Sequence, residues 1–145
     1  MDEVKLYFAY GSNLYKEQMK VRCPKSKYLE KHYFDDHKLC FCWNGLSTNP
    51  NGVANIIKET GSKVPGVIYE ISKSDEKRLD IYEEYPILYK KMYFNYYNNE
   101  IMTYIMVKQS TYKKPTEKYL NTIIKGYKDC KLDKKYLNKA LRPSW

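Results

Sequence analysis

One short segment near the start of the chain joins a strand-like run to a cluster of turn-forming residues. Residues 7–14 read YFAYGSNL, so Gly11, Ser12 and Asn13 directly follow apolar and aromatic residues. A strand that ends in a polar turn is therefore predicted. Consecutive backbone N–H groups in such a turn can converge on an anion, which makes the turn a candidate binding site for a negatively charged group.

A second segment places two carboxylates among aromatic side chains. Residues 79–86 read LDIYEEYP, with Glu83 and Glu84 at the end of a predicted helix. Burial raises the pKa of a carboxyl group towards the range that is useful for proton transfer near neutral pH. This segment is therefore a candidate for general acid–base chemistry.

A metal site is one alternative that the sequence offers. Five possible ligands fall within twenty residues, namely Cys23, His32, His37, Cys40 and Cys42. They contain no C-x-x-C pair and match no zinc-ligand spacing, so no metal and no other cofactor is predicted. Cys40 and Cys42 are two apart in a predicted strand, so they should face the same side and pack in the core.

A nucleophilic serine or cysteine is a further alternative. Such a nucleophile needs a base, and His32 and His37 show no recognisable partner pattern. Ser12 lacks the G-x-S-x-G context of a nucleophile elbow. The turn at Gly11 also lacks the second glycine and the Gly-Lys-Ser/Thr ending of a phosphate loop. Both mechanisms are therefore disfavoured.

The size and composition of the chain predict one cytoplasmic domain that spans residues 1–145. Chains usually divide only above roughly 250 residues, and 43% of these 145 residues are hydrophobic, enough for a core. No apolar run approaches the ~18 residues of a membrane span, and residues 1–5 lack the order of a secretory signal. Four cysteines are too few for a disulfide-stapled domain. No membrane partner is predicted.

Hydrophobic patterning predicts an α+β chain with its strands concentrated before residue 108. Strands are expected at residues 4–10, 33–43, 53–58, 66–71, 89–97 and 101–107. Residues 44–52 are expected to form a loop, and Asn98, Asn99 and Glu100 a hairpin connection. Helices are expected at residues 15–21, from Ser74 to Glu83, from a first turn that contains Pro115, and after Asp133.

The two candidate segments, together with two further motifs, resemble the γ-glutamylcyclotransferases and their AIG2-like relatives. The resemblance is carried by YFAYGSNL at residues 7–14, Arg22-Cys23-Pro24, PGVIYEI at residues 65–71 and LDIYEEYPILYKK at residues 79–91. A looser similarity continues through Tyr104 and from Pro115 to Tyr127. The resemblance implies a small mixed β-barrel with helices packed outside.

The resemblance also implies roles for individual residues. The family's turn motif, which binds the γ-glutamyl group, corresponds to Tyr10, Gly11, Ser12 and Asn13. The catalytic glutamate corresponds to Glu83. Glu84 is the rival, because two adjacent acids leave room for a shift of one position and the family usually has glycine there. The family's pocket tyrosines correspond to Tyr89, Tyr104 and Tyr119.

The implied reaction is an intramolecular cyclisation. The α-amino group of a γ-glutamyl compound attacks its own γ-carbonyl, which yields 5-oxoproline and a free amine without activated water or cofactor. The expected partner is thus a small γ-glutamyl molecule. Glutathione, γ-glutamyl amino acids, γ-glutamyl amines and larger γ-glutamylated metabolites all stay open as substrates, as does the oligomeric state. The loops at residues 44–52 and 85–88 are predicted to distinguish the leaving groups.

Two functions of other classes remain open from the sequence. A catalytically silent γ-glutamyl-binding domain could use the same scaffold. A nonspecific nucleic-acid binder could use the basic end of the chain, since residues 108–145 hold 11 basic and 3 acidic side chains, against 15 and 14 in residues 1–107. Only Arg142 in that end is an arginine, the residue on which base-specific recognition depends heavily, so no specific nucleic-acid partner is predicted. A solvated lysine face is the simpler interpretation.

Overall fold

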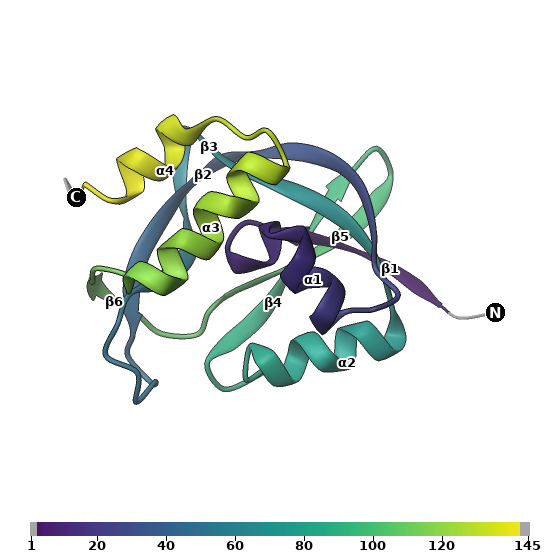
Figure 1. The fold of residues 1–145 in the computed structure, drawn as a ribbon, viewed down its shortest axis with the longest axis horizontal. Coiled ribbons are helices and arrows are strands. Elements are labelled where there is room, and N and C mark those ends of the chain that lie inside the picture. Colours follow the sequence, from purple (N-terminus) through teal and green to yellow (C-terminus); the bar gives the residue numbers. More distant parts are fainter. Residues whose placement is uncertain (1–2, 143–145) are drawn as a thin grey trace.

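Six strands form one mixed sheet, which curls into a half-barrel (Figure 1). The computed structural model describes residues 3–142, so the two ends of the predicted domain, residues 1–2 and 143–145, lie outside the described residues. The strand order is β4-β5-β1-β3-β2-β6, and only β1 and β5 pair in parallel. The strands are β1 (Val4–Ala9), β2 (Lys27–Asn44), β3 (Val53–Ser72), β4 (Tyr89–Tyr96), β5 (Asn99–Met106) and β6 (Gln109–Tyr112).

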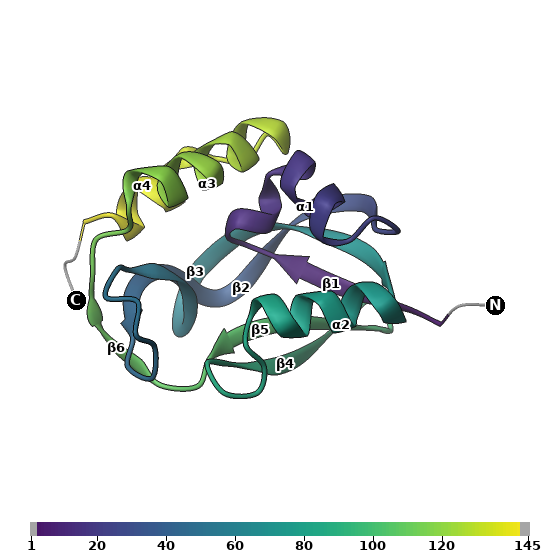
Figure 2. The same cartoon turned by 60° about the horizontal axis from the view of Figure 1, so that its bottom comes forward.

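Within residues 3–142, four α-helices and one short 3-10 helix complete the fold. They are η1 (Ser12–Leu14), α1 (Lys16–Arg22), α2 (Lys73–Tyr82), α3 (Glu117–Asp129) and α4 (Lys134–Ala140). Helix α1 lies between α2 and α3 in both views (Figures 1 and 2). The predicted class, a small mixed barrel with helices packed outside, is confirmed. None of the helices in the described part of the chain combines the length and apolar character that a membrane crossing requires.

Strands β2 and β3 are continuous arms, where the sequence predicts three shorter strands at residues 33–43, 53–58 and 66–71. The prediction misses residues 27–32, which are mostly polar yet pair with residues 66–70 of β3, and residues 63–65, which pair with residues 33–35 of β2. A backbone ladder needs only N–H and C=O partners, and polar side chains can face water on one side of an antiparallel pair. A register shift around Asp36 and a left-handed Gly61, with φ of 87°, accommodate the bend. The Gly61 N–H donates to the Asp36 carboxylate at 3.0 Å.

The hairpin and the last two helices follow the predicted order with shifted boundaries. Tyr97 and Asn98 form the two-residue loop, both with positive φ, as a type I′ turn requires; the connection is therefore one position earlier than predicted. Pro115 precedes Thr116, whose hydroxyl caps α3 by accepting from the Tyr119 N–H at 3.2 Å. Pro115 thus lies before the helix and not in its first turn. Helix α4 begins after Asp133 as expected, and the Asp133 carboxylate caps it by accepting from the Lys135 N–H.

The core lies between the sheet and the helices, and it includes the residues that hold the candidate turn. Phe8, Leu14, Leu79 and Tyr127 are almost completely buried there. Cys40 and Cys42 are both buried, with their sulfur atoms 3.2 Å apart, in a small separate cluster with Met106. The prediction that these two cysteines share one side of a strand and pack in the interior is confirmed.

Helix α3 approaches the turn at η1 closely because Gly126 has no side chain. A Cβ atom at Gly126 would lie 2.4 Å from the Leu14 Cβ and 2.7 Å from the Tyr15 backbone nitrogen. We expect Gly126→Ala to lower the free energy of unfolding by about 1–2 kcal/mol, because the cost of overpacking exceeds the helix propensity that alanine adds. Urea denaturation measures this change. Asn121→Ala, on an exposed position of α3, is the matched control and should be neutral; equal stability of both variants would contradict the expectation.

Candidate active site

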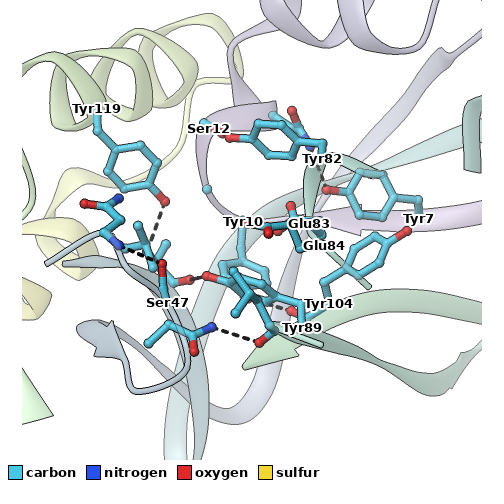
Figure 3. Close-up of a pocket in the computed structure, with 17 residues that line it drawn as sticks. Tyr7, Tyr10, Ser12, Ser47, Tyr82, Glu83, Glu84, Tyr89, Tyr104 and Tyr119 are labelled. Carbon is cyan, nitrogen blue, oxygen red and sulfur yellow. Dashed lines mark hydrogen bonds between the residues drawn. The ribbon is translucent and has the colours of Figure 1, made fainter. Parts of the chain in front are cut away.

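The eight residues singled out by the sequence line one cavity of about 230 Å³. These residues are Tyr10, Gly11, Ser12, Asn13, Glu83, Tyr89, Tyr104 and Tyr119. They come from the end of β1 and the adjoining η1, the end of α2, the strands β4 and β5, and α3 (Figure 3). Segments that lie far apart along the chain therefore meet around a single space, and Glu83 lines it together with the turn at residues 10–13.

Helix α2 places Glu83 by well-defined signals at both of its ends. The Ser72 hydroxyl accepts from the Asp75 N–H at 3.1 Å and the Asp75 carboxylate accepts from the Ser72 N–H at 3.2 Å, a complete capping box. Leu79 anchors the helix in the core with no exposed surface. Glu83 is the C-cap residue, and its N–H donates to the Leu79 carbonyl at 2.8 Å. The Glu83 side chain therefore leaves the helix about one turn after the buried Leu79.

Glu84 occupies the left-handed position that ends the helix. Its φ is 51°, and the Glu84 and Tyr85 N–H groups donate to the carbonyls of Ile81 and Asp80 at 3.1 and 2.9 Å. This is the Schellman arrangement, in which glycine is preferred after the C-cap. The glycine that the resembled family usually has here thus has a backbone explanation. Glu84 is an exposed residue at the cavity.

The Glu84→Gly variant separates the two glutamates. We expect it to raise the free energy of unfolding by about 1 kcal/mol, because a side chain in the left-handed region costs roughly 1–2 kcal/mol and the greater freedom of unfolded glycine offsets part of this gain. Chemical denaturation measures the stability. For the reaction that the resemblance implies, turnover of a γ-glutamyl donor should stay within a few-fold of the unaltered protein. A loss of turnover as large as that of a Glu83 variant would instead assign the proton transfer to Glu84.

Burial raises the pKa of Glu83 to about 7, and the nearby positive charge of Arg22 opposes this rise. The residue keeps partial exposure, which it has through the cavity that it lines. Glu83 lies between Tyr10 and Tyr7 in Figure 3, among rings that displace water from around the carboxyl group. A carboxyl group in this setting can exchange a proton near neutral pH.

Arg22 fixes one side of the turn. Its guanidinium donates to the Asn13 side-chain oxygen at 2.6 Å and to the Ser12 hydroxyl at 3.1 Å. It also lies 3.4 Å from the centre of the Tyr82 ring, and the Tyr82 hydroxyl is 3.2 Å from the Ser12 oxygen. A fixed positive charge therefore lies beside the turn, although Arg22 is not among the residues that line the cavity.

The turn is also held from within the core. The Asn13 side-chain amide donates to the Tyr7 hydroxyl at 3.0 Å, and the Tyr69 hydroxyl donates to the Asn13 carbonyl at 3.0 Å. The Leu14 N–H donates back to the Gly11 carbonyl at 3.1 Å. The first N–H groups of a helix have no partner within that helix. The turn therefore presents backbone donors from a rigid support.

Four tyrosine hydroxyls around the cavity are held by named partners. Tyr10 donates to the Tyr104 carbonyl at 2.6 Å, and Tyr104 donates to the Asp80 carboxylate at 2.6 Å. At Ala54, Tyr89 donates to the backbone carbonyl at 3.2 Å, and Tyr119 accepts from the backbone N–H at 3.0 Å. Burial raises the pKa of each of these four tyrosines, so all keep their protons near neutral pH.

The sequence interpretation assigned no role to several residues that the structure places here. Tyr7, Ala54 and Tyr82 line the cavity, and Arg22 lies behind it. Tyr7, Arg22 and Tyr82 belong to motifs that carry the resemblance, and their place in these motifs could have identified them as site residues. Nothing in the sequence marked Ala54. The loop at residues 44–52 contributes Asn44, Ser47 and Asn49, and the stretch at residues 85–88 contributes Leu88.

The possible metal ligands lie in separate surroundings. The Cys23 thiol contacts the Asp75 carbonyl at 3.7 Å, and the His32 ring packs against Phe94 and Tyr96. Cys40 and Cys42 face each other in the interior. Across residues 3–142, no group of three or more His, Cys, Asp or Glu side chains is arranged to hold a metal ion.

Comparisons with known proteins agree on one family. The profile of the family described as gamma-glutamyl cyclotransferase, AIG2-like, matches residues 7–122. Gamma-glutamylcyclotransferases of Bos taurus and Homo sapiens are each 34% identical, over 84 and 88 residues. These alignments cover 52% and 54% of this chain but only 42% and 44% of the relatives, so the match spans less than half of their length.

Solved structures extend the similarity to almost the whole chain. A structure titled gamma-glutamyl cyclotransferase has a TM-score of 0.82 and 27% sequence identity, and the match covers 98% of this chain and 90% of that one. A structure of an uncharacterised protein from Homo sapiens has a TM-score of 0.79 and 28% identity, over 99% of this chain and 90% of that one. The similarity thus includes both segments that form the cavity.

Proposed function

This chain belongs to the gamma-glutamyl cyclotransferase, AIG2-like family, and from that premise we propose that it cyclises a γ-glutamyl compound to 5-oxoproline. The substrate is a γ-glutamyl amine, amino acid or peptide, and the second product is the free amine. One observation carries the proposal. Glu83, whose pKa is raised to about 7 by burial, lines the same cavity as the backbone turn at Gly11 to Asn13.

In the proposed reaction, Glu83 is the general acid and base. The ionised carboxylate takes a proton from the α-ammonium group of the substrate, which frees the nitrogen lone pair. That nitrogen attacks the γ-carbonyl carbon, a new C–N bond closes the five-membered ring, and the C–N bond to the leaving amine breaks. Glu83 then returns its proton to the leaving nitrogen. The ring nitrogen gives up its surplus proton through solvent to the released amine, so the products are 5-oxoproline with one N–H and an ammonium ion. The nucleophile is part of the substrate, so its proximity is provided before binding.

The turn at residues 10–13 binds the γ-glutamyl group in this proposal. Its backbone N–H groups act as fixed donors for the substrate carboxylate or for the oxyanion that develops on the γ-carbonyl oxygen. The positive charge of Arg22, which is hydrogen-bonded to Ser12 and Asn13, favours negative charge at this end of the cavity. The protonated hydroxyls of Tyr89, Tyr104 and Tyr119 contribute polar contacts on the remaining walls.

The pH profile of the reaction follows from the pKa of Glu83. Only the ionised carboxylate accepts the proton, so kcat/KM should rise tenfold per pH unit at low pH and bend near pH 7, because kcat/KM reports groups of the free enzyme. Initial rates between pH 5 and pH 8.5 measure the bend. A profile that is flat over this range would contradict the assigned role.

A screen of γ-glutamyl donors for 5-oxoproline tests the function itself. Glutathione, γ-glutamyl amino acids, γ-glutamyl amines and larger γ-glutamylated metabolites are each incubated with the protein, and 5-oxoproline is quantified by mass spectrometry with Glu83→Gln as the matched control. Release of 5-oxoproline from at least one donor by the unaltered protein alone supports the proposal. Binding of donors without product at any pH would instead indicate a silent γ-glutamyl-binding domain.

A further inference from the structure

A second cavity, of about 440 Å³, lies between α4 and the arms formed by β2 and β3. Helix α4 runs alongside these strands at the C-terminal end of the molecule (Figure 1). The described lining residues are Lys38, Leu39, Cys40, Gly61, Ser62, Lys63, Lys135, Tyr136, Lys139, Ala140 and Arg142. None of them lines the cavity at Glu83, so the two sites are separate.

The walls of this second cavity are strongly basic. Five cationic side chains line it, from Lys38, Lys63, Lys135, Lys139 and Arg142, and none of its described lining residues is acidic. Three of the five belong to the basic end of the chain, residues 108–145. The docking of α4 against the sheet thus gathers at one place a charge excess that the sequence shows only as a run of lysines.

Nearby carboxylates neutralise only part of this charge. Glu59 lies 3.3 Å from the Lys38 ammonium and 4.0 Å from that of Lys139, and Asp133 lies 3.7 Å from that of Lys135. Among the described residues, these two carboxylates form ion pairs with three of the five cations. The Lys38 side chain is only 22% exposed, so one of these charges is partly removed from water, where attraction to an anion is stronger than at an open surface.

The floor of the cavity is apolar. Leu39 and Ala140, both of the main core, are buried beneath it, and Tyr136 contributes a partly buried ring that packs edge-on against Tyr33 with 5.7 Å between ring centres. An apolar floor with charged groups at the rim is typical of small-molecule sites, which enclose about 300–1,000 Å³. A solvated lysine face would need neither the enclosed volume nor the apolar floor.

We propose that this basic cavity binds an organic phosphate of nucleotide size, with its phosphate groups at the cationic rim and its ring over the apolar floor. Several cations around one small space match a compact polyanion better than a single carboxylate. Lysine is an effective phosphate ligand as a point charge. A cavity of this size does not offer the extended groove and stacking platforms that a nucleic-acid strand uses.

Calorimetric titration with ATP tests the proposal, with inorganic triphosphate as the second probe and Mg²⁺ removed by a chelator. The double variant Lys135→Gln/Lys139→Gln removes two rim charges, and Lys118→Gln/Lys134→Gln is the matched control with the same net charge. The Lys135 and Lys139 side chains are 69% and 68% exposed, so both double variants should fold, which thermal unfolding verifies.

We expect ATP to bind the unaltered protein at physiological salt. The Kd for ATP should rise about tenfold or more in the rim variant and change by less than about twofold in the control. Inorganic triphosphate should bind at least about tenfold weaker than ATP, because it leaves the apolar floor uncovered. Absence of ATP binding would overturn the proposal, as would equal weakening in both double variants, triphosphate binding as tight as that of ATP, or binding of a single-stranded oligonucleotide alone. The outcome is independent of turnover at Glu83, because the cavities are separate.

Discussion

The Glu83→Gln variant is expected to release 5-oxoproline about 10² to 10⁴ times more slowly than the unaltered protein, the usual contribution of a positioned general acid or base. Glutamine has nearly the volume of glutamate but cannot take up or deliver a proton near neutral pH. The hydroxyls of the surrounding walls, including those of Tyr10 and Tyr104, keep their hydrogen-bond partners within the protein. Steady-state kinetics on a donor identified by the screen measures the loss.

Glu84→Gln is the matched control for this experiment. It removes the same type of charge one residue further along the chain, at an exposed position, and should keep kcat/KM within a few-fold. Substrate affinity should change less than kcat in the Glu83 variant, because the turn at residues 10–13 is unaltered. Full activity of Glu83→Gln on a confirmed substrate would remove Glu83 from the mechanism.

The second large effect concerns the free energy of unfolding. At alkaline pH, that of Glu83→Gln is expected to exceed that of the unaltered protein. The pKa of Glu83 rises from 4.5 to about 7 on folding, because burial disfavours the charged form. Between these values the folded state binds more protons than the unfolded state, so the folded protein loses stability as the pH rises. The full loss is reached above pH 7 and amounts to about 3 kcal/mol, at 1.36 kcal/mol per pKa unit.

Urea denaturation of both proteins at pH 5 and pH 8 measures this effect. Glu83→Gln should gain on the unaltered protein between the two pH values, by about 2 kcal/mol or more, since most of the titration falls within this interval. A constant contribution of the glutamine amide does not affect the result, because only the difference between the pH values counts. A stability difference that does not change with pH would show that the Glu83 carboxyl has an ordinary pKa.

The two expectations for Glu83 describe one trade-off. A carboxyl group held in a poorly solvated cavity is suited to proton transfer and lowers the stability of the fold when it ionises. Helix α2 offsets this cost by its capping box at Ser72 and Asp75 and by the complete burial of Leu79. The turn at residues 10–13, held through Asn13, must also be rigid, because its backbone donors must stay in place whatever the charge of Glu83.

Local patterns in the sequence predicted most elements that carry the site. The alternation and aromatic content of residues 4–10 indicated β1, the hydroxyl and acidic residues at Ser72 to Glu76 indicated the start of α2, and helical spacing indicated α3. These signals act over a few residues, since capping, turn formation and periodicity depend on near neighbours. For that reason the order of elements and the motifs at residues 7–14 and 79–86 could be found without coordinates.

Properties that depend on contact between distant segments could not be found in this way. The unbroken length of β2 and β3, and the presence of β6, depend on backbone hydrogen bonds to a partner strand, which the mostly polar residues 27–32 form as well as apolar ones. Ala54 holds two tyrosines through its backbone, a contact that its side-chain type does not reveal.

The conformations of the two adjacent glutamates and the arrangement of the basic end likewise depend on the tertiary structure. A two-glutamate sequence does not state which residue takes the left-handed conformation at the end of α2. The hydrogen bonds that close the helix place Glu84 there and Glu83 at the C-cap, and both residues line the cavity. The lysines of residues 108–145 are a linear run in the sequence, and the packing of α4 against β2 and β3 turns some of them into the wall of a cavity. Short-range chemistry thus determined which residues were available, and long-range packing determined which of them face each other.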